Sequence, residues 1–210
     1  MEKREALINE CLAEVARRYD RTFRFYHGYK HSSMVLGYVT ILTKMAGCTE
    51  IETEILQFSA AGHDWEQEKG RIKNEKESGR LLGDVMRRYG YSEDEISFVQ
   101  CLVMGTVVYW TKGVMHQEAE SMGQLAKLLA DADLCALGAP EADFVDMAQR
   151  TMAEIAKKPI EKFTGQELLN GWQSQVKFMT GRRYLTPEAN ELFGEQMKAN
   201  LAYAKRMAGE

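Results

Sequence analysis

Cysteine, proline and histidine are scarce in this 210-residue sequence, which contains four, three and four of them respectively. The cysteines are widely scattered and form no Cys-x-x-Cys pair, which argues against a zinc ribbon, a thioredoxin-like redox site and a disulfide framework. Few prolines, together with abundant Ala, Glu, Lys, Leu and Met, favour a helical chain. The cysteines are Cys11, Cys48, Cys101 and Cys135.

The sequence also lacks a long hydrophobic run and a strong net charge. Its most apolar segment, residues 98–110, is shorter than the ~20 residues of a membrane-spanning helix, so we expect a buried core helix there. No apolar stretch of the signal-peptide kind follows Met1. The formal net charge of -4 provides no basic field for nucleic acid or for an anionic membrane. We therefore expect a cytoplasmic protein that binds neither nucleic acid nor membranes.

Apolar residues at helical spacing, together with capping residues, predict helices along the whole chain. In the first half of the chain, helices are expected at residues 3–19, then one that ends near Gly47, one from Thr49 to His63-Asp64, one from Asn74 through Met86 and one at 93–109. In the second half, they are expected from Leu125 to Leu137, at 141–157, after Thr164, and from Thr186 to about Met207. The β-branched residues 106–108 could instead form a strand. We find no repeat, linker or β-α-β alternation, and we predict a single all-α domain over residues 1–210.

One apolar segment ends in adjacent ligand-type side chains. Residues 58–62 are Phe-Ser-Ala-Ala-Gly, and they lead directly into His63 and Asp64. Burying an unpaired carboxylate costs several kcal/mol, so a buried His-Asp pair needs a cation or an ion-pair partner. His31, 32 residues earlier (63 − 31), and Asp133, 69 residues later (133 − 64), could supply the rest of a metal site.

Two imidazoles and two carboxylates suit a first-row divalent cation that keeps open positions for water and substrate. A water bound to such an ion becomes a usable nucleophile near neutral pH. With four histidines in the whole chain, one metal ion is favoured over two. The pattern is compatible with Mn, Fe, Co, Ni, Zn or Mg, and does not choose among them.

Four segments in this order resemble the HD-domain superfamily of metal-dependent phosphohydrolases. Residues 26–32 (Tyr-His-Gly-Tyr-Lys-His-Ser) are similar to a Tyr-His-Asn-x-x-His element of one branch of that superfamily and of cyclic nucleotide phosphodiesterases. His63-Asp64 matches the pair that names the superfamily. Residues 74–78 resemble Asn-Glu-x-x-Ser, and residues 131–138 resemble Asp-Ala-Asp-Leu-x-x-Leu-Gly.

The resemblance covers residues from about 26 to 139 and implies a compact helical HD-domain bundle with a further helical extension at about 140–210. It implies that the metal ligands are His31, His63, Asp64 and Asp133. Asp131 is the alternative to Asp133, although it points to another face of the expected helix. Asp64 would also position or deprotonate the attacking water.

The resemblance also implies roles for two other residues. Glu75 matches an acid of the family that could orient water or a leaving group. His27 matches the phosphodiesterase histidine that protonates the leaving oxygen, although Gly28 replaces the asparagine that follows it in the family.

Basic side chains near these motifs are candidates for substrate binding, because phosphate recognition needs cationic donors. The candidates are Lys30, Arg71, Lys73 and Lys112. His116 lies in a glycine-broken segment and is expected to be an ordinary loop residue.

The expected function is hydrolysis of a phosphomonoester or phosphodiester, in a nucleotide or similar small metabolite, by a metal-activated water. An HD-fold di-iron oxygenase is one alternative, but it needs about two more histidine ligands between Asp64 and Asp133, where only His116 occurs. A non-catalytic module that binds a metal and a nucleotide is the other. The extension from about residue 140 could be a lid, a pocket wall or a homodimer surface.

Overall fold

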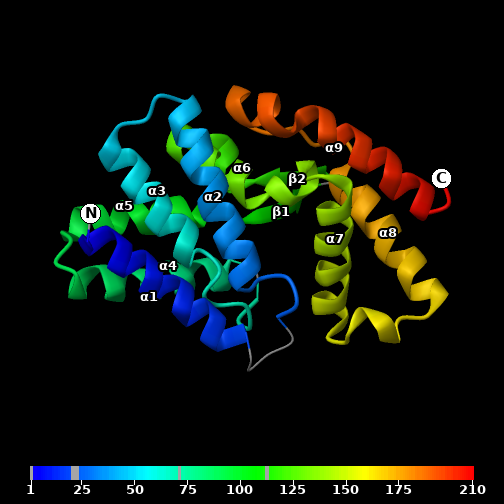
Figure 1. Ribbon diagram of the computed structural model, residues 1–210, viewed down its shortest axis with the longest axis horizontal. Helices are drawn as coiled ribbons and strands as arrows, with labels where there is room; N and C mark the ends of the chain where they lie inside the picture. Colours follow the sequence, from blue (N-terminus) through cyan, green and yellow to red (C-terminus); the bar gives the residue numbers. More distant parts are fainter. Residues whose placement is uncertain (1, 20–23, 71, 112–113) are drawn as a thin grey trace.

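Nine α-helices, three short 3₁₀ helices and a two-stranded antiparallel sheet make up the regular structure of the described residues (Figure 1). This computed structural model describes residues 2–19, 24–70, 72–111 and 114–210. The elements are α1 (Glu2–Tyr19), α2 (Tyr29–Met45), α3 (Glu50–Gly62), α4 (Lys73–Arg88), α5 (Glu93–Met104), β1 (Val108–Thr111), β2 (Val114–Gln117), η1 (Glu118–Ser121), α6 (Gln124–Asp133), η2 (Cys135–Gly138), α7 (Glu141–Ala156), η3 (Ile160–Lys162), α8 (Gly165–Met179) and α9 (Pro187–Met207). The predicted all-α class is confirmed.

The helices begin at the capping residues that the sequence indicates. Thr49, Ser92 and Thr164 each accept a hydrogen bond from the third helical amide, and a glutamate three positions on returns a bond to the cap. Thr186 accepts from the Ala189 amide, with Pro187 as the first helical residue of α9. Each such cap is worth about 1 kcal/mol, so local signals determine where these helices begin.

Helix α3 lies between two hydrophobic clusters. Leu56 and Ala60 belong to a cluster that includes residues of α2, α6 and the C-terminal helices, whereas Phe58 and Ala61 belong to one with residues of α1, α4 and α5. Because both faces of the C-terminal half of α3 are covered, residues 58–62 are all buried, whereas the first turns of the helix carry Glu50, Glu52 and Glu54. This explains the continuous apolar run before His63, and it places the end of α3 inside the molecule.

The C-terminal helices join the first of these clusters. Figure 1 shows α7, α8 and α9 on one side, α1 to α5 on the other, and α6 with the β1–β2 hairpin between them. Where η2 meets α9, a Cβ on Gly138 would lie 2.5 Å from the Phe193 Cβ, so only glycine allows this approach. The Asn200 amide also donates to the carbonyls of Leu137 and Ala139, at 2.9 and 2.8 Å.

Two predicted helices end earlier than the sequence indicates. The helix expected at 93–109 ends at Met104, and Val108–Thr111 pairs with Val114–Gln117 in an antiparallel hairpin. The β-branched residues before Tyr109 therefore favour extended backbone, which was the alternative reading of that segment. The helix expected to reach Leu137 ends at Asp133 and continues as the 3₁₀ helix η2. This change of helix type leaves Asp133 at the last turn of α6.

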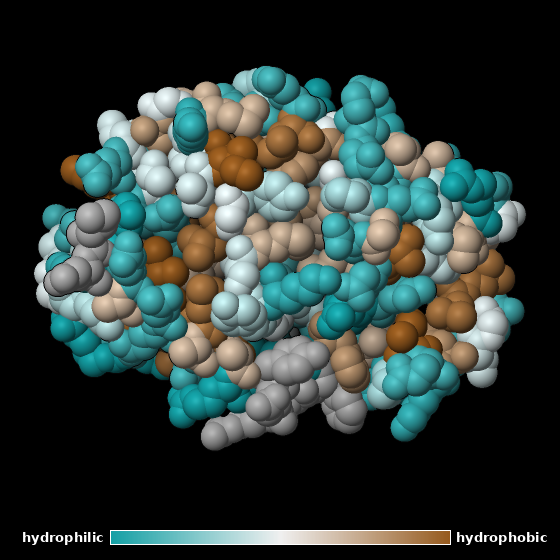
Figure 2. All heavy atoms as spheres, viewed as in Figure 1, coloured by the Kyte–Doolittle hydropathy of each residue, from teal (hydrophilic) through white to brown (hydrophobic). Residues whose placement is uncertain are grey.

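The outer surface mixes polar and apolar side chains. On the face drawn in Figure 2, hydrophobic residues form several separate groups divided by hydrophilic ones. All four cysteines are free thiols, as their spacing predicts. Among the described residues, no helix is both long enough and apolar enough to cross a membrane.

Candidate metal centre

Three helices deliver His31, His63, Asp64 and Asp133 to one point. His31 lies in the first turn of α2, His63 caps the end of α3 with Asp64 next to it, and Asp133 ends α6. One possible ligand atom from each residue lies within 4.8 Å of the other three. The four residues that the sequence singles out are thus neighbours, although His31 and Asp133 are 102 positions apart.

The spacing of these atoms suits ligands that share one ion. The Nε2 atom of His31 is 3.0 Å from both Asp64 Oδ2 and Asp133 Oδ1, and the Nε2 atom of His63 is 2.9 and 3.1 Å from the same oxygens. The two Nε2 atoms are 3.3 Å apart. Ligands about 2.1 Å from a common cation are separated by about 3.0 Å in octahedral and about 3.4 Å in tetrahedral geometry. The donor set therefore fits a divalent cation.

The tautomer of His63 supports this interpretation. Its Nδ1 lies 2.8 Å from the Ala60 carbonyl oxygen, and only a protonated Nδ1 can make that hydrogen bond. In the neutral ring, Nε2 then carries a lone pair, which faces the carboxylate oxygens of Asp64 and Asp133. Such an arrangement is repulsive unless a proton or a metal ion lies between them.

The pKa values of the cluster also indicate that a positive charge is favoured between the histidines and the carboxylates. Burial lowers the pKa of His63, but the charges of Asp64 and Asp133 outweigh burial and raise that pKa well above 6.5. Burial raises the pKa values of both carboxylates, yet the adjacent imidazoles lower that of Asp133 to about 2 and that of Asp64 well below 3.8. The two carboxylates are therefore ionised, and positive charge is favoured between them.

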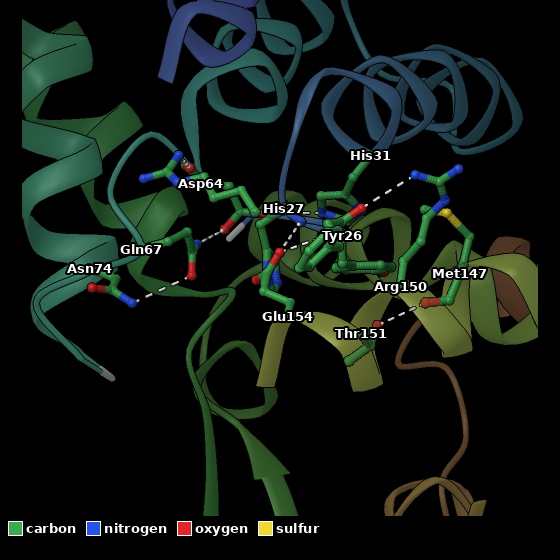
Figure 3. A network of polar contacts seen from close by, with 12 residues as sticks. Tyr26, His27, His31, Asp64, Gln67, Asn74, Met147, Arg150, Thr151 and Glu154 are labelled. Atoms are coloured by element: carbon green, nitrogen blue, oxygen red, sulfur yellow. Dashed lines mark hydrogen bonds and ion pairs between the residues drawn. The ribbon is translucent and has the colours of Figure 1, made fainter. Parts of the chain in front are cut away.

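Polar side chains fix the orientation of Asp64 (Figure 3). Gln67 Nε2 donates to Asp64 Oδ1 at 2.8 Å, and Asn74 Nδ2 lies 3.4 Å from Gln67 Oε1. This leaves Asp64 Oδ2 directed at the two histidines. Buried Arg24 donates to the backbone carbonyls of Asp64 and Trp65, at 3.3 and 2.9 Å, and so satisfies acceptors at the end of α3.

His27 lies beside the cluster and is bound to Glu154 of α7 (Figure 3). The other carboxylate oxygen of Glu154 accepts from the amides of Tyr26 and His27, at 2.8 and 3.0 Å. Burial lowers the pKa of His27, but the charge of Asp64 and the hydrogen bond to Glu154 raise it to about 9. His27 is therefore protonated at neutral pH. With Nδ1 bound to Glu154, its Nε2–H is available to a ligand.

The cluster opens into a pocket of about 790 Å³ that the N-terminal and C-terminal halves of the chain line together. Asp64, Asp133, His27 and Glu75 form its polar end. Helices α7 and α8 form much of the remaining wall, which contains Met147, Met152, Ile155, Phe163, Asn170, Ser174, Gln175 and Phe178. The C-terminal helices are thus a pocket wall, which is one of the three roles considered from the sequence.

Glu75 lies at the polar end of this pocket, in the first turn of α4. Its Oε2 atom is buried without a hydrogen-bond partner. Burial raises its pKa, and the charges of Asp64 and Asp133 add to that increase. Glu75 is therefore a carboxyl group that can accept and release a proton next to the cluster.

Asp131 has a structural role instead of a ligand role. Its carboxylate is fully buried and accepts from the Leu185 amide at 2.8 Å, the Thr186 amide at 2.8 Å and the Thr186 hydroxyl at 2.7 Å. Asp133, two positions later, belongs to the cluster. The two aspartates of the Asp-Ala-Asp segment thus face different partners, and Asp131 anchors the start of α9.

Two of the four basic side chains proposed for substrate binding, Lys30 and Lys73, are not brought to this pocket. Lys30 is exposed and pairs with Asp146 at 2.7 Å, and Lys73 is exposed at the start of α4. Neither is among the described residues that line the pocket. Arg71 and Lys112 lie outside the described residues. His116 lies on β2 beside Glu120, with its ring stacked on Tyr109, and does not join the cluster.

Two residues of the site were missed by the sequence reasoning. Glu154 is 127 positions from His27, and no local pattern links it to the histidine. Gln67 lies three positions after Asp64, and that spacing is the only signal that could have identified it.

Comparison with protein-family models, with curated proteins and with solved structures gave no match. Membership of the HD-domain superfamily therefore stays a prediction, and the site must be interpreted from its own geometry.

Proposed function

We propose that this chain is a metal-dependent phosphohydrolase of the HD type that acts on a small phosphomonoester or phosphodiester. The observation that carries the proposal is the convergence of His31, His63, Asp64 and Asp133 at the polar end of the pocket. Two neutral nitrogens and two carboxylates favour a divalent cation over a monovalent one. When bound, such an ion would polarise a phosphoryl oxygen and lower the pKa of a coordinated water.

Asp64 has two tasks in this proposal. Its Oδ2 faces the two imidazoles, and Gln67 prevents the carboxylate from turning away by donating to Oδ1. Asp64 is therefore in place to orient the attacking water as well as to ligate the ion. Glu75, with its raised pKa and its unpartnered buried oxygen, takes up the proton that the water loses.

His27 supplies the proton for the leaving group. It lines the pocket, it is cationic at neutral pH, and Glu154 fixes the orientation of its ring. An ester oxygen leaves more readily when it is protonated as its bond to phosphorus breaks. Gly28 stands where the family has an asparagine. In this chain Glu154 of α7 orients the His27 ring instead.

The charge of the pocket limits the substrate. Among its described lining residues, His27 and Lys177 are cationic at neutral pH, and Glu167 adds a carboxylate to those of the polar end. The α7 and α8 wall is mainly apolar or uncharged. A substrate with one phosphoryl group and an uncharged body fits this lining better than a polyphosphate does.

Hydrolysis of a panel of phosphorylated metabolites tests the proposal, with phosphate release measured for monoesters and chromatography of the products for diesters. Protein loaded with at least one of the candidate divalent metals should hydrolyse a member of the panel, and chelation or Asp64→Ala should abolish the hydrolysis. His116→Ala is the matched control, because His116 lies outside the cluster, and it should keep full activity. Tight ligand binding without turnover would favour the non-catalytic module instead. Two irons per chain with oxygen consumption would favour the oxygenase.

A further inference from the structure

A second pocket, also of about 790 Å³, lies next to the first and shares Trp110, Lys177 and Phe178 with it. Its lining includes β2, the start of α9 and the segment that joins α8 to α9. None of the proposed metal ligands lines it. Charged side chains in the segment between α8 and α9 and near it determine the charge of this pocket.

The described lining of this second pocket is strongly basic. The basic side chains are Lys127, Lys177, Arg182 and Arg183, whereas Glu120 is the acidic one. An excess of cationic groups around a concave surface raises the local concentration of anions.

Arg182 is the central feature of the pocket. Its guanidinium is largely buried, and its Nε and Nη1 atoms are buried without a hydrogen-bond partner. Its Cζ lies over the Phe178 ring, 4.5 Å from the ring centroid, and its Nη2 contacts Met115 Sδ. Burial lowers the pKa of Arg182 to about 10, so the group is still charged at neutral pH.

The charges of nearby carboxylates act on this cation, but none of these groups forms a hydrogen bond or an ion pair with it. Asp131 is engaged by the amides of Leu185 and Thr186 and by the Thr186 hydroxyl. Glu120 accepts from the Gln117 amide at 3.0 Å and lies 3.2 Å from His116 Nδ1. A buried cation with unpaired N–H groups is costly unless an anion joins it.

We propose that this pocket binds the phosphate group of a small molecule, with Arg182 as the main donor and Arg183 and Lys127 as flanking cations. Guanidinium N–H groups form charge-assisted hydrogen bonds to phosphate oxygens. Trp110 lines the same pocket and provides a flat surface for the body of the ligand. None of the four proposed metal ligands lines this pocket, so its ligand can bind without a metal ion in the cluster.

Calorimetric titration with inorganic pyrophosphate tests the proposal. Metal-free protein prepared with a chelator should bind pyrophosphate, and it should bind citrate, a carboxylate anion, more weakly. Arg182→Gln should raise the dissociation constant about tenfold or more, which is the usual consequence of losing charge-assisted hydrogen bonds. His63→Ala should leave the constant unchanged, because His63 does not line this pocket.

Two further variants keep the test decisive if Arg182→Gln folds poorly. Lys127→Gln with Arg183→Gln changes only flanking side chains and should weaken binding severalfold. Lys198→Gln is the matched control, because Lys198 pairs with Glu195 on α9 and does not line the pocket. Absence of pyrophosphate binding, unchanged binding in the double variant, or equal binding of citrate would overturn the proposal.

Discussion

At the scale of single residues, the function of this protein depends on how protons and cations are shared among a few buried groups. His63 faces two ionised carboxylates, so its Nε2 holds either a proton or a metal ion. Its raised pKa means that the metal-free protein is protonated there at neutral pH. Metal binding must then displace that proton.

The competition between a proton and a metal ion for His63 Nε2 gives a first prediction. Binding of Mn²⁺ or Zn²⁺ to the metal-free protein at pH 7 should release about one proton, and the affinity should rise with pH. Calorimetry in two buffers of different ionisation enthalpy measures the number of protons released. Binding that releases no proton, with an affinity independent of pH, would show that the ion does not bind at His63.

The second prediction concerns His27 and Glu154. Because the folded pKa of His27 is about 9, the stability that its charge provides is fully present below about pH 6.5 and is lost as the pH rises through about 9. Glu154→Gln removes one source of that shift and should lower the pKa of His27. An NMR titration of the metal-free protein measures it.

Glu161→Gln is the control for that titration, because it removes an exposed carboxylate that does not line the pocket. It should leave the pKa of His27 where it is in the unchanged protein. If His27 had the same pKa in Glu154→Gln as in the unchanged protein, Glu154 would not be a source of its raised pKa.

At the scale of helices and loops, the site is placed by helix ends. His31 is near the start of α2, while His63 and Asp133 are at the ends of α3 and α6. Helix ends carry backbone groups without intrahelical partners, and here Arg24 and Asp131 satisfy several of them. These anchors hold the ends of α3 and the start of α9 in fixed positions.

The third prediction separates the two neighbouring aspartates. Asp131→Ala leaves two backbone amides and a hydroxyl unpaired, so it should reduce the free energy of unfolding by about 3 kcal/mol or more while metal still binds. Asp133→Ala should abolish metal binding at a smaller cost in stability, because it removes one of two adjacent negative charges. Urea unfolding and metal titration of both variants measure these effects. The opposite pattern would make Asp131 the ligand.

Much of this arrangement could be predicted from the sequence, since the signals for it are local. Capping boxes at Thr49, Ser92 and Thr164 mark helix starts, and the apolar run before His63 indicates a buried helix. The sequence predicts that α5 continues to about residue 109, beyond its end at Met104, because Val107 and Val108 suit either a helix in a core or a strand. The choice between them depends on pairing with β2, which the local sequence does not contain.

At the scale of the whole molecule, the pocket belongs to both halves of the chain. The N-terminal helices bring the four ligand residues, and α7 and α8 bring Glu154 and the apolar wall. The sequence could not predict this, because no motif links residues beyond 140 to the metal cluster. The shared hydrophobic cluster, in which Leu128 and Phe193 take part, joins the halves energetically as well.

The fourth prediction follows from that shared core. Far-ultraviolet circular dichroism and tryptophan fluorescence should report one unfolding transition with a common midpoint, since exposing either half would uncover apolar surface of the other. A chain cut after Pro140 should fail to fold to a cooperative state. Two separate transitions, or a folded fragment of residues 1–140, would show that the C-terminal helices are an independent unit.

The central claim, that His31, His63, Asp64 and Asp133 bind one divalent cation, is tested most directly by metal content. Elemental analysis of purified protein after equilibration with a slight excess of Mn²⁺ or Zn²⁺ should give about one ion per chain. His63→Ala and Asp133→Ala should give almost none while keeping their helical circular dichroism, and His116→Ala should match the unchanged protein. Full metal content in both His63→Ala and Asp133→Ala would contradict the account.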